Sequence, residues 1–414
     1  MLKKALAGLS LVLGSTIATK ALSLVAFYFV GEYLSQEQLG EYAFLFGIAG
    51  IFVSFQNLNL QPLMIQRKVV ARQHLSEYFS LCLIFNIITF IIGSAVIIII
   101  FNNELSSIFN GVSILLSSLL SIGLVRQRVK YLEAHLFKKV AIFNFFISAI
   151  QYITLSALVV YTENVLAYGM SYLALAIASL IFISIRDIRI PRLKFVKAAS
   201  TKIKWMLAGG VASNLAINSP YIIIGFFEST VITGIFYFVN QSSLSLVGLI
   251  SMPIRSVILP LLDSKGSADS KDFGTLSALI SGLMVVGVVI LNTILEMLIE
   301  LVWGDKWLEA IPVLKLALLC TGVSIVNQLI WTYSQAKGRW SVRPIGLFLE
   351  ATFLSIVLLV SCIMYDDILV ISVCYFSAML FYSLLLQAYT MFYFKVGLKT
   401  TIVLSAFCLI YTVA

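Results

Sequence analysis

The sequence predicts an all-α integral membrane protein with about twelve transmembrane helices in two bundles of six. Of its 414 residues, 60% are hydrophobic and only 11% are charged, and the mean hydropathy is +1.02. A soluble globular protein has about 45–50% apolar and about 25% charged residues, so the composition excludes that class. Sixty per cent of 414 is about 248 apolar residues, and one helical span needs about 20, which leaves room for roughly twelve spans.

Twelve apolar stretches, bounded by charged or turn-forming residues, are the expected spans. The first six are Ala5–Val30, Gly40–Ile65, Tyr78–Phe101, Ile108–Val125, Val140–Tyr161 and Val165–Ile185. The second six are Trp205–Phe227, Val231–Leu262, Phe273–Val302, Ile311–Gln335, Ile345–Met364 and Ile368–Phe394. We therefore expect an N-terminal bundle at 1–185, a basic connector at 186–204, a C-terminal bundle at 205–394 and a tail at 395–414. The apolar end of the tail would extend only about 21 Å as a helix, too short to cross a bilayer alone.

The positive residues lie almost entirely on one side of this topology. About 25 of the 28 Lys and Arg residues fall in the N-terminal segment and the alternate loops that share its side, whereas the opposite loops contain Lys306 and several acids. Because short cytoplasmic loops are enriched in Lys and Arg, we expect a multi-pass protein of the bacterial cytoplasmic (inner) membrane with a cytoplasmic N-terminus. The net charge of +9 then reflects membrane topology and not nucleic-acid binding.

No metal site is expected. The five cysteines lie singly in apolar stretches, and the two histidines lie in basic connecting segments without neighbouring Cys or carboxylate ligands. The chain also lacks the phosphate-binding GxxxxGK[ST], the GxSxG nucleophile turn and the zinc-binding HExxH, and its outer loops are short. We therefore expect a protein that is not an enzyme and acts between its helices.

Basic side chains inside the predicted spans are candidate anion-binding groups. Lys20 lies near the middle of the first span, where a lysine costs about 2.5–3.5 kcal/mol, so it should face a cavity or an anion. A packing role opposite a carboxylate or carbonyl is the alternative. Lys315 could instead extend to the outer surface, and Arg255 could instead anchor the topology at the cytoplasmic surface.

Amide side chains form a second candidate group, because each amide can both donate to and accept from a sugar hydroxyl. The candidates are Gln56, Asn57, Asn59, Gln61, Asn214, Asn218, Asn240 and Gln241. Hydrogen bonding between helices is the alternative for all of them. Glu296 and Glu350 are the main acids within the spans and are candidates for coupling transport to an ion, with a structural ion pair as the alternative. We expect no cofactor, and coupling to the membrane potential, H⁺ or Na⁺.

Several segments together resemble the polysaccharide (O-antigen, Wzx-type) flippases of the multidrug/oligosaccharidyl-lipid/polysaccharide (MOP) exporter superfamily. YLSQEQLGEYA at Tyr33–Ala43 resembles the family's YLGPEEFGxYA, and LMIQRK at Leu63–Lys68 follows at the end of the same span. MPIRSVILP at Met252–Pro260, WGDKWLEAIPVL at Trp303–Leu314 and AKGR at Ala336–Arg339 resemble three motifs of its second half. One departure is Asn218-Ser219-Pro220, where family members often carry an acid.

The resemblance implies two six-helix bundles around a cationic cavity that opens to each side in turn. It also implies a substrate in which an oligosaccharide is linked through pyrophosphate to undecaprenol. Lys20, Arg67, Arg255 and Lys315 are then the candidate cations, and Arg67 and Arg255 lie within matched motifs. Further expected partners are the lipid bilayer, a polysaccharide polymerase and a chain-length regulator.

Three other functions remain open from the sequence. One is an ion-coupled multidrug exporter of the same superfamily, which would favour carboxylates over a central lysine. The second is a membrane polysaccharide polymerase or ligase, which would need a catalytic outer loop. The third is a peptidoglycan-precursor flippase, which typically has a longer chain with additional spans.

Overall fold

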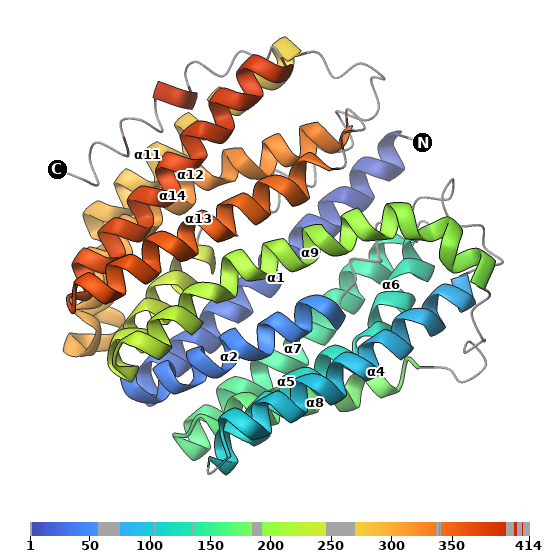
Figure 1. The fold of residues 1–414 in the computed structure, drawn as a ribbon, viewed down its shortest axis with the longest axis horizontal. Coiled ribbons are helices and arrows are strands. Elements are labelled where there is room, and N and C mark those ends of the chain that lie inside the picture. The colour runs from blue at the N-terminus through green and yellow to red at the C-terminus, as the bar shows by residue number, and fades with distance from the viewer. Residues whose placement is uncertain are drawn as a thin grey trace. The chain divides into compact units, whose positions relative to one another are not determined.

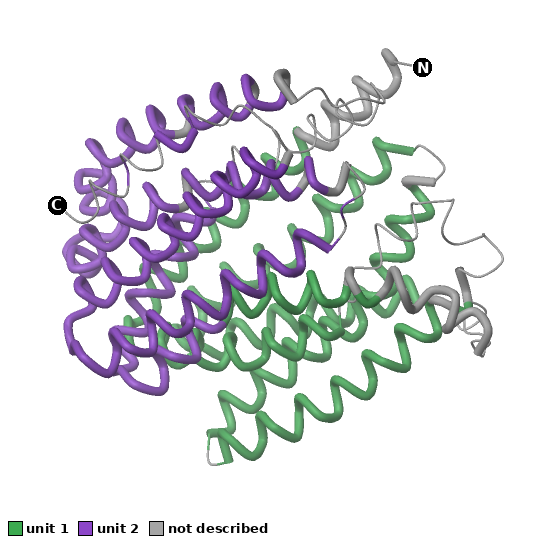
Figure 2. Tube along the Cα trace, turned by 45° about the horizontal axis from the view of Figure 1, so that its top comes forward, with its two compact units in different colours: residues 1–218 green, residues 219–414 purple. Residues whose placement is uncertain are grey.

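In the part of the chain that it describes, the computed structural model consists of helices joined by short turns and irregular connections. It describes residues 2–56, 75–102, 104–133, 136–183, 193–245, 270–336, 339, 341–394, 401–403 and 408. The chain divides into two compact units, residues 1–218 and 219–414, which are coloured separately in Figure 2. The predicted connector at 186–204 remains a prediction. Its residues 193–204 form the start of a helix that continues to Phe227.

Unit 1 is built from seven described helices and most of an eighth, labelled in Figure 1. They are α1 (Leu2–Tyr33), α2 (Gln36–Gln56), α4 (Leu75–Ile100), α5 (Leu105–Leu120), α6 (Ile122–Glu133), α7 (Phe137–Thr162), α8 (Leu166–Leu180) and α9 (Leu193–Phe227) as far as Asn218. Helix α1 packs along α7, α7 and α5 pack on α8, and α2 packs against α4 and α5.

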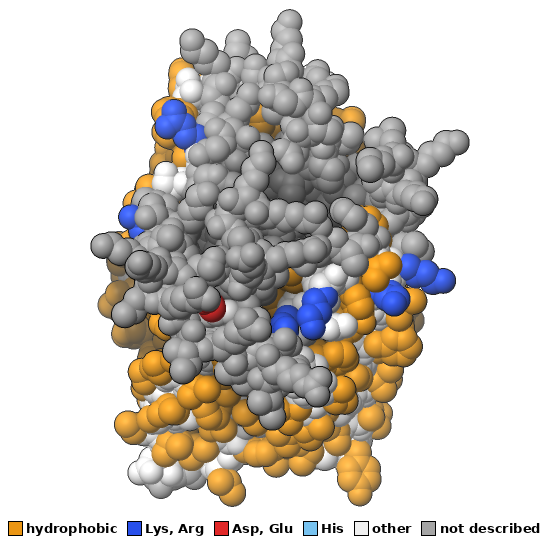
Figure 3. Space-filling view, turned by 90° about the vertical axis from the view of Figure 1, so that its right-hand side faces the viewer, with side chains coloured by type: hydrophobic (Ala, Val, Ile, Leu, Met, Phe, Trp, Pro, Cys, Tyr) orange, Lys and Arg blue, Asp and Glu red, His pale blue; other side chains and the backbone are white. Residues whose placement is uncertain are grey.

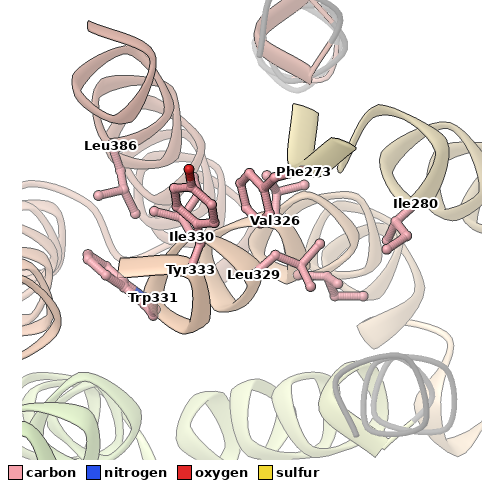
Figure 4. Close-up of a cluster of buried hydrophobic side chains, with 9 residues drawn as sticks. Phe273, Ile280, Val326, Leu329, Ile330, Trp331, Tyr333 and Leu386 are labelled. Atoms are coloured by element: carbon pink, nitrogen blue, oxygen red, sulfur yellow. The ribbon is translucent and has the colours of Figure 1, made fainter. Parts of the chain in front are cut away.

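Unit 2 contains the end of α9, a helical segment at 230–245 and four long helices. The long helices are α11 (Ser270–Trp303), α12 (Ala310–Ala336), α13 (Val342–Met364) and α14 (Ile368–Phe394), and the 3-10 turn η3 (Gly304–Trp307) joins the first two. Helix α12 packs against α11, α13 and α14, so it lies at the centre of this group. In Figure 4, Tyr333 of α12 lies beside Phe273 of α11, with their ring centroids 4.3 Å apart.

Ten described helical segments are long and apolar enough to cross a membrane, and they match ten of the twelve predicted spans. The sixth predicted span is the shorter apolar helix α8, and only residues 230–245 of the eighth are described.

The distribution of side chains is that of a protein surrounded by lipid. On α4, Ile91 and Ile99 are 60% and 74% exposed, whereas the polar Asn86 is only 2% exposed. Lipid chains accept exposed isoleucine, but a polar side chain needs hydrogen bonds that only the protein interior can offer. Hydrophobic side chains accordingly dominate the described surface in Figure 3, and Lys and Arg are its main charged groups.

Candidate functional site

Lys20 lies on a partly buried flank of α1, in the middle of a helix that packs along α7. Thr16 and Ser23, four residues before it and three after it, share this flank because of the helical repeat. The neighbouring flank, with Ile17 and Val25, is apolar and about half exposed. Lys20 forms no hydrogen bond or ion pair within the described part of the chain. Its charge therefore remains available to a bound anion.

Gln56 connects three helices of unit 1. Its side chain is 1% exposed, and its amide nitrogen donates to the main-chain oxygens of Asn86 on α4 (3.4 Å) and Leu115 on α5 (3.3 Å). The amide nitrogen of Asn86 donates in return to the main-chain oxygens of Gln56 and Cys82. These contacts match the alternative role for the amides, hydrogen bonding between helices. The substrate contact predicted for Gln56 remains a prediction.

The two asparagines of α9 differ in their surroundings. The amide nitrogen of Asn214 donates to the main-chain oxygen of Gly210 on its own helix, at 3.0 Å. Asn218 is 3% exposed and lies against Gly50 of α2, and its Oδ1 atom has no hydrogen-bond partner among the residues that the structure describes. Asn218 is thus a buried amide with unused hydrogen-bonding capacity.

Asn240 contacts a tyrosine that sequence reasoning missed. The amide nitrogen of Asn240 donates to the hydroxyl of Tyr221 at 2.7 Å, and the substrate contacts predicted for Asn240 and Gln241 remain predictions. Tyr221 is fully buried, and its ring packs against Phe236 and Tyr237. In the sequence, Tyr221 follows Pro220 and precedes an apolar stretch. This position alone does not indicate that its hydroxyl has a polar partner.

Lys315 and Glu296, predicted for different tasks, pair with each other. Lys315 Nζ on α12 lies 3.6 Å from Glu296 Oε2 on α11, and their side chains are 39% and 64% exposed. Asn292, one turn before Glu296, donates from its amide nitrogen to the main-chain oxygen of Lys315 at 3.3 Å, while its buried Oδ1 atom has no hydrogen-bond partner among the described side chains and main-chain groups. In this structure the charge of Lys315 is therefore balanced by a carboxylate, as the alternative prediction for Glu296 anticipated.

Glu350 differs from Glu296 in having no ion pair with a described residue. It is partly buried on α13 and forms no hydrogen bond or salt bridge with any residue that the structure describes. The neighbouring turn of α13 contacts α14, because the hydroxyl of Tyr382 donates to the main-chain oxygen of Gly346, one turn before Glu350. An acid without a described partner at this position is able to hold a proton or a cation.

Five further candidates, Arg67, Arg255, Asn57, Asn59 and Gln61, lie outside the described residues. Their predicted substrate contacts remain predictions. Among the described residues no three His, Cys, Asp or Glu side chains are grouped to hold a metal ion.

The motif that begins α2 has a structural explanation. The Ser35 hydroxyl accepts from the Gln38 main-chain N–H (3.1 Å), and Gln38 Oε1 accepts from the Ser35 main-chain N–H (2.9 Å), which is a reciprocal capping box. The Gln38 amide nitrogen also donates to the main-chain oxygen of Glu163, at the end of α7 (3.2 Å). The motif therefore fixes the start of α2 and ties it to α7.

The motif at Trp303–Leu314 makes the turn between α11 and α12. Gly304 has φ +63°, a left-handed conformation that favours glycine. The turn places Trp307, which is 0% exposed, in a stack on Phe238 with ring centroids 4.0 Å apart. The glycine and tryptophan of this motif thus maintain the fold.

These features define a polytopic membrane protein with buried amides, tyrosines and charges between its helices. Three solved structures share its fold. The lipid II flippase MurJ, in an inward closed conformation, matches with a TM-score of 0.67 and 14% identity over 96% of this chain and 90% of that chain. An inward-facing multidrug resistance MATE family transporter of the MOP superfamily gives 0.60 and 10% over 95% and 93%. MATE in complex with MaL6 gives 0.51 and 9% over 96% of both chains.

At these identities the likeness shows the fold, which is that of the MOP transporters. A family model described as polysaccharide biosynthesis protein matches residues 32–312, more than half of the chain, and the chain belongs to this family. The resemblance predicted from the sequence is thereby confirmed. A search of curated proteins finds no match. Family and fold support a multi-pass membrane protein of polysaccharide biosynthesis, and the solved neighbours are described as a flippase and as MATE transporters.

Proposed function

We propose that this protein is a flippase that moves an undecaprenyl-pyrophosphate-linked oligosaccharide, such as an O-antigen repeat unit, from the cytoplasmic to the outer leaflet by alternating access. The observation that carries the proposal is the combination of a polysaccharide biosynthesis family with a fold shared by a lipid II flippase. A multidrug exporter would share the fold but not this family match. A polymerase or ligase would have a different fold and would carry catalytic groups in an outer loop.

Lys20 is the proposed anchor for the pyrophosphate. It lies within a membrane-spanning helix and has no carboxylate partner among the described residues, so a diphosphate would supply the missing negative charge. Arg67 and Arg255 are proposed to assist it. Lys315 would assist only after separating from Glu296, 3.6 Å away.

The membrane potential is the proposed driving force, with a cytoplasmic N-terminus in a bacterial inner membrane. Outward movement of one negative charge is favourable by about 2.3 kcal/mol per 100 mV, so two charges give about 4.6 kcal/mol when no cation travels with them. Glu350 is the stronger candidate for additional H⁺ or Na⁺ coupling, since Glu296 is already paired with Lys315.

Complementation of a flippase-null strain tests the proposal. The wild-type chain should restore surface polysaccharide, Lys20→Ala should abolish the restoration, and Lys20→Arg should retain part of it because the positive charge remains. Lys138→Ala, at an exposed lysine of α7, is the matched control and should behave as wild type. Unchanged polysaccharide in a well-expressed Lys20→Ala strain would refute the role of Lys20, and wild-type chain without any restoration would refute the flippase assignment.

A further inference from the structure

Helix α2 contacts α9 within unit 1 where Gly50 lies against Asn218. A Cβ atom at position 50 would lie 2.5 Å from Nδ2, 2.6 Å from Cγ and 2.8 Å from Oδ1 of Asn218, all inside the 3.0 Å that real Cβ contacts respect. The Asn218 amide therefore occupies the space of the missing side chain. A residue larger than glycine fits here only if the Asn218 side chain leaves this position or the two helices separate.

The same contact leaves a hydrogen-bonding group unsatisfied. Asn218 is 3% exposed, and its Oδ1 atom has no hydrogen-bond partner in the described part of the chain. The hydroxyl of Ser54, one turn along α2, is already engaged with the main-chain oxygen of Gly50 at 2.8 Å. Close packing of small residues favours the contact, whereas a buried amide oxygen without a donor opposes it. The unsatisfied amide oxygen therefore lowers the stability that close packing gives to this contact.

The backbone of α9 is weakened beside this contact. Pro220 lies within the helix and lacks the N–H that would bond the main-chain oxygen of Ala216. The division between the two compact units also falls here, between Asn218 and Ser219. Small changes in the path of α9 are therefore least costly next to Asn218.

We propose that the Gly50–Asn218 contact is a closing contact of the transport cycle. In the closed state the Asn218 amide is buried against Gly50, and in the open state it is released to water and to the hydroxyls of the sugar substrate. This inference deepens the proposed function and rests on it for the sugar, but the opening and closing of the contact can be measured without any substrate.

Thiol modification of Ser54→Cys measures the opening directly. The full chain, with its five native cysteines replaced, is reconstituted in nanodiscs and treated with a small methanethiosulfonate reagent. Because Ser54 is 3% exposed, the thiol should react slowly when Gly50 is present. Gly50→Ala should raise the rate by roughly 10-fold or more, a ratio that corresponds to about 1.4 kcal/mol. Adding Asn218→Ala makes room for the new methyl group and should return the rate to within roughly 3-fold of the starting protein.

Gly287→Ala is the matched control, because a Cβ at that glycine meets nothing within 4 Å. It should leave the rate unchanged. An unchanged rate in Gly50→Ala, or a double variant that reacts as fast as Gly50→Ala, would overturn the closing contact. If Gly50→Ala is not monodisperse, Asn218→Ala alone decides: a rate at or below that of the starting protein supports the proposal, and a faster rate overturns it.

Surface polysaccharide in the flippase-null strain separates this inference from the proposed function. Gly50→Ala should reduce restoration by at least roughly 10-fold relative to Gly287→Ala. Thiol rates that follow the expected order, together with a wild-type chain that restores nothing, would overturn the sugar substrate while supporting the closing contact. Full restoration by Gly50→Ala would overturn the role of the contact in transport.

Discussion

Replacement of Trp307 by alanine should destabilise unit 2 more than any exposed aromatic substitution in that unit. Trp307 is 0% exposed, stacks on Phe238 with an interplanar angle of 10°, and Phe238 also meets the ring of Trp303 edge to face at 5.2 Å. Removal of a buried tryptophan costs about 3–5 kcal/mol, to which the lost ring stacking contributes about 0.5–1.5 kcal/mol. A unit of 150–250 residues loses about 2–4 °C per kcal/mol, so we expect a fall of roughly 6–20 °C in apparent Tm.

Fluorescence-detected size exclusion after heating, at one fixed heating time, provides the assay in nanodiscs. A fixed protocol is needed because large proteins commonly unfold irreversibly, so apparent Tm values are compared only within the series. Trp307→Phe keeps a ring on Phe238 and should lose less than Trp307→Ala. Phe226→Ala, at a 65% exposed position near the end of α9, is the control and should change little. Equal losses in Trp307→Ala and Phe226→Ala would refute the claim that the motif acts through the buried stack.

Two further predictions concern the loop ends of the helices. Ser35→Ala removes the side-chain acceptor for the Gln38 N–H and should lower the free energy of unfolding by about 1 kcal/mol. Ser35→Asp should be nearly neutral because aspartate also caps helices. A lower apparent Tm for both variants would contradict the capping role. Burial, with a smaller contribution from the carboxylate of Asp366, raises the pKa of Glu228. The folded state therefore binds this proton more tightly than the unfolded state. Stability falls as the pH rises from the unfolded-state pKa of Glu228 through its folded-state pKa. Glu228→Gln should therefore raise the apparent Tm at pH 8 but not at pH 4, and an equal gain at both pH values would exclude titration of Glu228 as the cause.

Hydropathy predicted the spans because lipid imposes one requirement on every helix. A membrane helix must be long, apolar and internally hydrogen bonded, and these properties are visible in a single segment of sequence. The third predicted span, Tyr78–Phe101, agrees at both ends to within one residue with the observed segment Phe79–Ile100. The fifth, Val140–Tyr161, agrees to within three residues with Phe137–Thr162. The short α8 is the exception, since the apolar stretch predicted there continues beyond the described helix.

The candidate site was less predictable, because a polar residue in a span has the same sequence signature whether it binds a substrate or a neighbouring helix. Gln56 engages two main-chain oxygens, and Asn240 engages the hydroxyl of Tyr221, which no local pattern could pair with it. Lys315 and Glu296 are 19 positions apart in different predicted spans, and only the packing of α11 on α12 brings them to 3.6 Å. Partners of this kind are a property of tertiary structure.

The remaining contrast between the two intramembrane lysines bears on how the transporter would work. Lys315 carries its own counter-charge, so binding a diphosphate there would first require the loss of its attraction to Glu296. Lys20 carries no such partner among the described residues, so an anion would gain its full attraction on arrival. An unpaired cation inside a membrane destabilises the protein when no ligand is bound. An anionic ligand that pairs with the cation offsets this cost. Lys20 is therefore the stronger candidate for diphosphate binding. Glu296→Gln removes the counter-charge of Lys315 and leaves Lys20 unchanged, so this variant should bind diphosphate more tightly than the starting protein.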